Sequence, residues 1–421
     1  GWYRRRLDIT SADRGKRLWL EFDGVFRDSL VFVNGYIVGR SESGYAPFRV
    51  DIGDFLDYDG GPNQLTVRVD ASLGEGWFYE GAGIYRSVKL VRAAPVHIPQ
   101  WGTFVRAEIR ADGALIKTSV DVNNDSAAEA QAVLRQRILS PDGAVAAKLD
   151  DVAIMLGTDE RRQLDADARI TAPLLWSIET PQLYTLISEL LIDGKVIDRY
   201  STPFGIRSIR FDAENGFFLN GKPVKLMGTC NHQDHAGVGT AIPDRLNAWR
   251  IEQVQSMGSN AWRSAHNPPS EALLDICDAK GMLMINEARL NSTDPEAMAQ
   301  LERIVRRDRN HPCIILWSVG NEEPHQGTER GAAVSAEMIR AIRRLDTTRS
   351  TTQAFDNSFD RGASRVVDVI GFNYRIDQIP GFHTRFPDQP VIGSETGSTV
   401  ATRGEYVNDA ARHIVRAYDS E

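Results

Sequence analysis

The pattern of apolar residues changes near residue 206 of this 421-residue chain. Before that point, short apolar runs alternate with polar residues and are divided by turn sequences, which is typical of β-strands. After it, short apolar runs alternate with stretches in which apolar residues recur at helical spacing. Repeated β–α units require a parallel sheet with helices outside it, because parallel strands need long crossover connections. The sequence therefore predicts a multidomain protein, all-β first and α/β afterwards.

The all-β part divides into two sandwiches. Asn34-Gly35 lies between two apolar runs and predicts a two-residue hairpin, because both turn positions favour positive φ. A break near Ala93-Ala94-Pro95 is a plausible boundary. Two small successive β-sandwiches fit this pattern best, one over residues 1–93 and one over residues 94–205.

The third domain, residues 206–421, contains seven candidate strands, whereas a (β/α)₈ barrel needs eight. The candidates are residues 224–227, 261–264, 283–285, 314–318, 350–353, 369–372 and 391–393. Thr293-Asp294-Pro295 predicts the start of a helix, with a capping residue ahead of a proline at the first helical position. An open barrel would leave two strand edges unpaired. Either the chain is a fragment of a longer protein, truncated after strand 7, or the count is one strand short.

Composition narrows the range of partners. The formal net charge of −8 argues against nucleic acid, which needs clustered Lys and Arg. No apolar run approaches the roughly 20 residues that span a bilayer, so no membrane partner is expected. Cys230, Cys277 and Cys313 suggest neither a disulfide framework nor a Cys-x-x-Cys metal site. The chain starts at Gly1 without a signal-like segment, which leaves location open, with a bacterial periplasmic or secreted one favoured over the cytoplasm.

Two glutamates directly follow predicted strands. Glu322 comes after the fourth strand and Glu395 after the seventh. In a parallel barrel these strand ends meet at one rim, where active sites lie. Glycoside hydrolysis needs two carboxyl groups, one to protonate the leaving oxygen and one to attack the anomeric carbon or activate water. A single glutamate at a strand end is usually a solvated loop residue, but this pair favours a glycosidase.

Seven stretches make the prediction specific. They are residues 79–86, 204–207, 218–223, 263–269, 307–312, 317–322 and 393–395. In this order they resemble glycoside hydrolase family 2, which contains β-galactosidases, β-glucuronidases and β-mannosidases. The resemblance implies a jelly-roll sugar-binding domain, an immunoglobulin-like domain and a TIM barrel. It also implies that Glu322 is the acid/base, that Glu395 is the nucleophile, and that hydrolysis retains the anomeric configuration.

Three further residues follow from position and chemistry. Asn321 precedes the acid/base and is expected to bind the 2-hydroxyl of the sugar. Arg263 ends the second strand and is expected to hold Glu395 ionised through charge-assisted hydrogen bonds. Tyr374 ends the sixth strand and is expected to donate to the nucleophile. The alternatives are a strand-end cap for Asn321, a surface ion pair for Arg263 and core packing for Tyr374.

Other candidates line the expected sugar pocket. His266 and Asn267 belong to a proline-rich loop and are expected to contact the sugar, with a role only in the turn as the alternative. Trp317 is either an apolar floor under the sugar ring or part of the barrel core. His232 and Asp234 follow the first strand and are expected to hydrogen-bond the sugar.

The segment that contains His232, Asp234 and His235 also suggests a metal site. Zinc would need more ligands at suitable spacing, and none follow, so no metal ligand is predicted. No cofactor is expected to be required, although a structural or activating divalent cation is left open. The expected partner is a carbohydrate, and the sandwich surfaces suggest a possible homo-oligomer.

The sequence therefore predicts a retaining exo-β-glycosidase that hydrolyses terminal β-D-galactosides by double displacement. Galactosides come first because residues 307–312 and 393–399 most resemble the galactosidase branch. A β-glucuronidase of the same family is the alternative; it needs a cationic group that in relatives follows strand 7. A catalytically incomplete carbohydrate-binding fragment is a third possibility, because the barrel lacks its eighth strand.

Overall fold

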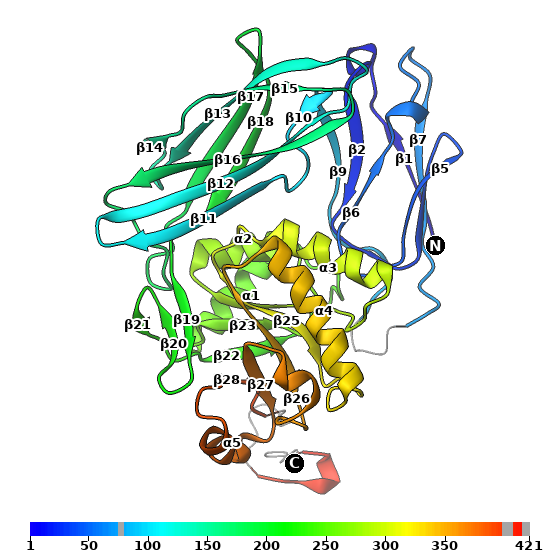
Figure 1. Cartoon of the computed structure of the whole chain (residues 1–421). Helices are drawn as coiled ribbons and strands as arrows, with labels where there is room; N and C mark the ends of the chain where they lie inside the picture. Colours follow the sequence, from blue (N-terminus) through cyan, green and yellow to red (C-terminus); the bar gives the residue numbers. More distant parts are fainter. Residues whose placement is uncertain (75–79, 398–406, 415–421) are drawn as a thin grey trace.

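The computed structural model describes residues 1–74, 80–397 and 407–414. Figure 1 shows two β-sandwiches next to each other, with an α/β domain packed beneath both. The predicted order of two all-β domains and one α/β domain is confirmed. Tyr79 of the 79–86 motif and residues 398–399 of the 393–399 block lie outside the described residues.

The first sandwich consists of two antiparallel sheets and a short strand pair. One sheet has the order β1 (Trp2–Leu7), β7 (Asn63–Arg68), β4 (Ser29–Val33), β5 (Tyr36–Ser41). The other sheet has the order β6 (Phe48–Asp51), β2 (Arg17–Phe22), β9 (Val88–Ala93). The short pair consists of β3 (Val25–Phe26) and β8 (Gly83–Ile84). Asn34 and Gly35 have φ of 50° and 89° and connect β4 to β5, which confirms the predicted hairpin. Alternate residues of β4 and β7, such as Val31 and Val67, fill the core.

The second sandwich is also antiparallel. One sheet has the order β10 (Val96–His97), β12 (Gly113–Asn124), β11 (Thr103–Arg110), with β16 (Glu160–Ile170) on β12; the other has β14 (Val145–Lys148), β13 (Ala130–Leu139), β17 (Tyr184–Ile192), β18 (Lys195–Phe204), with β15 (Val152–Leu156) on β13. Inward-facing residues of both sheets, among them Ile116, Ile138 and Leu186, form the core.

The α/β domain begins with a small antiparallel sheet of β19 (Ile209–Asp212), β20 (Gly216–Leu219) and β21 (Lys222–Pro223). Its main sheet is parallel and follows the order of the chain: β22 (Gly228–Asn231), β23 (Ala261–Ser264), β24 (Leu283–Glu287), β25 (Ile314–Asn321), β26 (Ser350–Phe355), β27 (Val369–Asn373) and β28 (Val391–Glu395). The helices are α1 (Asp244–Ser256), α2 (Glu271–Lys280), α3 (Pro295–Asp308), α4 (Glu329–Leu345) and α5 (Ile379–Arg385). This is a TIM barrel with seven strands among the described residues.

The first barrel strand was expected at residues 224–227, and that position is wrong. Lys222–Pro223 pair with β20 in a hairpin, so residues 224–227 form the connection and the strand starts at Gly228. The other six candidate strands are confirmed. So is the start of α3, where the Asp294 carboxylate accepts from the N–H groups of Glu296 and Ala297 at 3.1 and 3.0 Å.

Burial of the central strands places their ends at one rim. Every residue of β24, β25 and β27 is buried, as expected for parallel strands covered on both faces. Polar side chains therefore gather where the strands end. Within the described residues, no helix is both long and apolar enough to cross a membrane.

Candidate active site

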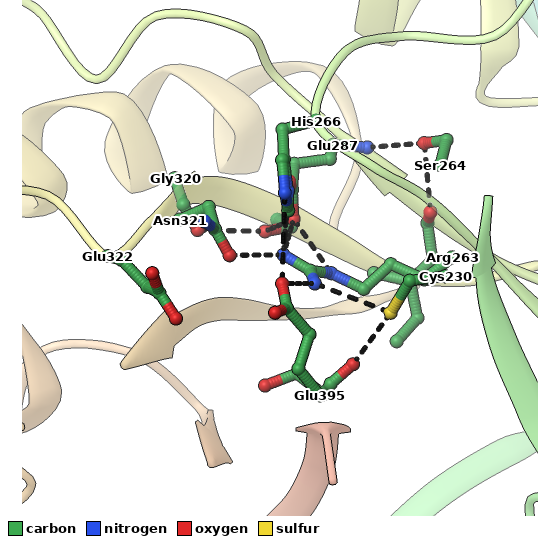
Figure 2. A network of polar contacts seen from close by, with 12 residues as sticks. Cys230, Arg263, Ser264, His266, Glu287, Gly320, Asn321, Glu322 and Glu395 are labelled. Atoms are coloured by element: carbon green, nitrogen blue, oxygen red, sulfur yellow. Dashed lines mark hydrogen bonds and ion pairs between the residues drawn. The ribbon is translucent and has the colours of Figure 1, made fainter. Parts of the chain in front are cut away.

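A cavity of about 630 Å³ runs along the barrel strands, from strand starts such as Gly228 and Ala261 to the carboxyl ends of the strands. Seven of the ten residues predicted for the site line it: His232, Arg263, His266, Asn321, Glu322, Tyr374 and Glu395. They come from segments that span more than 160 residues of sequence, and the parallel barrel brings them to one rim (Figure 2).

Glu395 is the last residue of β28, and both oxygens of its carboxylate have a donor. Arg263 Nη1 donates to Oε1 at 2.7 Å, and Tyr374 Oη donates to Oε2 at 2.6 Å. Both contacts were expected from the sequence. Two fixed donors hold the carboxylate in one orientation at the edge of the cavity, as a nucleophile requires.

Glu322 follows β25 directly and has a left-handed backbone, with φ of 52°. Its N–H donates to Ala354 O at 2.9 Å, and Asn373 Nδ2 donates to its Oε1 at 2.7 Å. Burial raises the pKa of Glu322, and the negative charge of Glu395 raises it further, whereas the hydrogen bond from Asn373 lowers it. A raised pKa is what a general acid needs near neutral pH.

Arg263 lies at the centre of the polar network. Its side chain is only 4% exposed, so the surface ion pair considered from the sequence is wrong. Its Nη2 donates to Asn321 Oδ1 at 2.7 Å, and its Nε and Nη2 donate to Glu287 (Figure 2). Burial alone would lower the pKa of Arg263, but the charges of Glu287 and Glu395 raise it above its ordinary value.

Asn321 is buried, and its carbonyl oxygen accepts from two donors. These are Arg263 Nη2 at 2.7 Å and Asn373 Nδ2 at 3.2 Å. Because both bonds use Oδ1, the amide NH₂ is oriented away from Arg263. This orientation leaves a donor for a ligand hydroxyl, in line with the role expected for Asn321.

Three predicted lining residues lie elsewhere. Trp317 is 2% exposed and donates from Nε1 to Asp346 Oδ2 at 2.9 Å, so it belongs to the barrel core and not to a sugar-binding floor. Asn267 lines a neighbouring cavity of about 450 Å³. Asp234 is not among the described residues that line either cavity, but its negative charge raises the pKa of both Arg250 and His232 against the effect of their burial.

The sequence suggests a metal site in the segment from His232 to His235 but predicts no metal ligand there. Its His232 ring instead packs edge-on against His266, with ring centroids 5.6 Å apart. Among the described residues, three possible ligands do lie together: Asp275, Asp278 and His311. They lie near the starts of the strands, because Asp278 accepts from the N–H of Cys313, just before β25. There His311 Nδ1 lies 2.6 Å from Asp278 Oδ2 in a buried ion pair.

Sequence reasoning missed three polar residues of the network. Glu287 ends β24 and binds Arg263, Asn373 ends β27 and binds Glu322, and Glu323 accepts from the Asn321 N–H at 3.3 Å. Burial raises the pKa of Glu323 to about 7. Asn373 directly follows one predicted strand and Glu287 lies two residues after another, so the rule that identified Glu322 and Glu395 would have found them too.

An arginine of the first sandwich reaches the loop that carries His266. Arg86 Nη2 donates to Pro268 O at 2.8 Å, and from the barrel side Arg307 Nη2 donates to Pro269 O at 2.7 Å. Carbonyls of such a loop have no partner within a helix or sheet, so these donors satisfy them. The first sandwich therefore supports the barrel beside the candidate site.

The buried His311–Asp278 pair predicts how stability depends on pH. Although burial alone would lower it, the Asp278 carboxylate raises the pKa of His311 to about 9. The pKa of a histidine in the unfolded chain is about 6.5, so the protonated ion pair stabilises the folded state fully below pH 6.5. This contribution is at most about 3 kcal/mol and is lost as the pH rises from 6.5 through 9. His311→Gln should therefore flatten the fall in Tm between pH 6.5 and 9. An unchanged slope would contradict the ion pair.

Comparison with known proteins extends these observations to the whole chain. Three protein-family models match the chain. Residues 1–94 match the model described as "Glycosyl hydrolases family 2, sugar binding domain", residues 96–207 the model described as "Glycosyl hydrolases family 2", and residues 212–410 the model described as "Glycosyl hydrolases family 2, TIM barrel domain". The three matches follow the order of the three folded parts.

Curated relatives and solved structures carry two kinds of name. A β-galactosidase of Bacteroides ovatus is 32% identical over 96% of this chain and 53% of its own length. A putative β-glucuronidase of Formosa agariphila is 31% identical over 96% of this chain and 38% of its own. The crystal structure of a family 2 member from Bacteroides cellulosilyticus has a TM-score of 0.88 and 35% identity, covering 93% of this chain and 55% of that one.

A Bacteroides uniformis β-glucuronidase structure has a TM-score of 0.85 and 30% identity, covering 93% of this chain and 52% of that one. The chain thus spans about half the length of most of these relatives. The predicted resemblance is confirmed across all three domains. On this fold, these motifs and these matches, the chain belongs to glycoside hydrolase family 2.

Proposed function

We propose that this chain carries the catalytic centre of a retaining exo-β-glycosidase, with Glu395 as nucleophile and Glu322 as acid/base. The observation that carries the proposal is the pairing of the two glutamates across one cavity. Glu395 is held by Arg263 and Tyr374, and Glu322 has a raised pKa. Environments that differ in this way suit a nucleophile and a general acid.

The reaction proceeds in two displacements. Glu395 attacks the anomeric carbon while Glu322 gives its proton to the leaving oxygen, which breaks the glycosidic bond and forms a glycosyl ester. Glu322, now ionised, takes a proton from water, whose oxygen attacks the anomeric carbon and releases the sugar and Glu395. The amide NH₂ of Asn321 binds the 2-hydroxyl, a contact that strengthens in the transition state. These steps need no cofactor.

The proposed substrates are terminal β-D-galactosides. The name of the Bacteroides ovatus relative supports this choice, as do the galactosidase-like blocks at residues 307–312 and 393–399. β-Glucuronides are the second candidate, because the Formosa agariphila and Bacteroides uniformis relatives bear that name at nearly equal identity.

Nitrophenyl glycosides distinguish these substrates. The purified protein should hydrolyse the β-galactoside with kcat/KM at least about 10-fold above that for the β-glucuronide, which corresponds to about 1.4 kcal/mol. The α-galactoside serves as the control and should not react. A preference for the glucuronide would replace the substrate but keep the mechanism. Binding of galactose without hydrolysis of any activated glycoside would favour an incomplete carbohydrate-binding fragment.

A further inference from the structure

Glu287 is a charged group that the two-step reaction does not use. It ends β24, it is fully buried, and it is not among the described residues that line the catalytic cavity. Three side chains donate to its carboxylate: Arg263 from Nε and Nη2 at 3.1 and 2.8 Å, Ser318 from Oγ at 2.8 Å, and His266 from Nδ1 at 2.8 Å. Two of these three also face Glu395.

We infer that Glu287 is a positioning residue, which fixes Arg263 and His266 and, through them, the carboxylate of Glu395. The inference rests on the proposed role of Glu395 as nucleophile. Figure 2 shows the Arg263 guanidinium between the two carboxylates, with one edge on Glu287 and its remaining nitrogen on Glu395.

The geometry of the guanidinium explains this role. Glu287 occupies the Nε–Nη2 edge of Arg263, which leaves Nη1 for a single bond to Glu395 Oε1. Arginine prefers two parallel bonds to one carboxylate. Without Glu287, the Arg263 guanidinium is free to rotate and donate two parallel hydrogen bonds to Glu395. That rotation would draw the carboxylate away from Tyr374 and shift the oxygen that attacks the sugar.

His266 is oriented by the same carboxylate. Its Nδ1 bonds to Glu287 Oε1, which turns Nε2 toward Glu395 Oε1 at 3.7 Å. A partner on one ring nitrogen fixes both the tautomer and the ring orientation. Burial alone would raise the pKa of Glu287, but the charge of Arg263 and the bond from His266 lower it, so Glu287 stays ionised as the anchor.

A purely structural ion pair is the competing explanation, and the chain offers a matched control. Asp278 is also a buried carboxylate bonded to a histidine, His311, but it accepts from the N–H of Cys313, which lies just before the start of β25 and so at the end of the strands away from the site. Glu287→Gln and Asp278→Asn both neutralise a buried acid while keeping its shape. Both should lower Tm, because each removes one member of a buried pair.

The test is rapid-mixing kinetics with an activated nitrophenyl glycoside, normalised to active sites titrated by a covalent fluoroglycoside inactivator. Glu287→Gln should lower the rate constant for formation of the glycosyl-enzyme about 10²-fold, the effect of a roughly 1 Å misplacement, with a smaller change in KM. Glu287→Asp, which keeps the charge, should recover part of that loss. Asp278→Asn should leave the rate constant per titrated site unchanged. Equal effects of Glu287→Gln and Asp278→Asn would overturn the inference.

A crystal structure of Glu287→Gln gives a readout that does not depend on activity. It should show the Arg263 guanidinium turned toward Glu395 and the His266 ring rotated. Unchanged positions of both side chains would also overturn the inference. If the wild-type protein hydrolyses no activated glycoside, the proposed function fails, while this structure still tests whether Glu287 positions Arg263 and His266.

Discussion

Glu395→Gly should lower kcat by on the order of 10⁶-fold, the scale seen when a hydrolase loses its covalent nucleophile. The substitution removes the group that attacks the anomeric carbon and leaves a space between Arg263 and Tyr374, which donate to the carboxylate at 2.7 and 2.6 Å. A small anion such as azide fits that space and meets the same two donors. Added azide should therefore restore turnover of an activated glycoside.

The configuration of the rescued product makes this test specific. Azide in place of Glu395 attacks from the face opposite the leaving group, so a β-glycoside should give the α-glycosyl azide, which NMR identifies. Formate, another small anion, is a second rescue agent. Tyr374→Phe is the milder variant: it removes one donor and should lower kcat without creating azide dependence. Full activity of Glu395→Gly without azide would refute the assignment.

Most of what could be predicted depends on one rule: polar residues at the carboxyl ends of parallel strands meet at one rim. That rule brings Glu322 and Glu395 together across 73 residues of sequence, and it predicted the bond between Arg263 and Glu395. The first barrel strand was misplaced because residues 224–227 are apolar enough for a strand. In the structure, Lys222–Pro223 pair antiparallel with β20, and residues 224–227 only connect this hairpin to the barrel. Local pattern does not reveal such pairing.

The direction in which side chains point was the other feature that the sequence could not predict. Trp317 lies four residues before Asn321 on one buried strand, and only the tertiary fold directs its indole to Asp346 instead of the cavity. Glu287 ends a strand at the same rim, but its partners Arg263, His266 and Ser318 come from separate segments. The sequence alone therefore does not show that its carboxylate is buried within a network.

The two adjacent glutamates after β25 show why geometry decides the assignment. Burial raises the pKa of Glu323 to about 7, a value that would suit a general acid. Glu323, however, accepts from the Asn321 N–H and is not among the described residues that line the catalytic cavity. Glu322 does line this cavity. Glu323 therefore supports the strand end, and of the two glutamates Glu322 is the one that fits the proposed role of acid/base.

Glu322→Ala should separate the two steps of the reaction. A nitrophenolate leaves without protonation, so formation of the glycosyl-enzyme should be nearly unaffected, while a poor leaving group such as an alkyl alcohol should lose about 10²–10⁴-fold in kcat/KM. Because wild-type Glu322 must carry its proton in this step, activity on the alkyl glycoside should fall as pH rises through its pKa, which burial raises. The variant should lack this fall.

Azide also distinguishes Glu322 from Glu323, through a product of the anomeric configuration opposite to that expected for Glu395→Gly. In Glu322→Ala the glycosyl-enzyme accumulates because no base activates water, and azide entering on the Glu322 side should give the β-glycosyl azide. Glu323→Gln is the matched control: it changes the neighbouring carboxyl, and its turnover should not depend on azide. If Glu323→Gln produced the β-azide and Glu322→Ala did not, the acid/base would be Glu323, and the order of the strand-end residues would have misled the assignment.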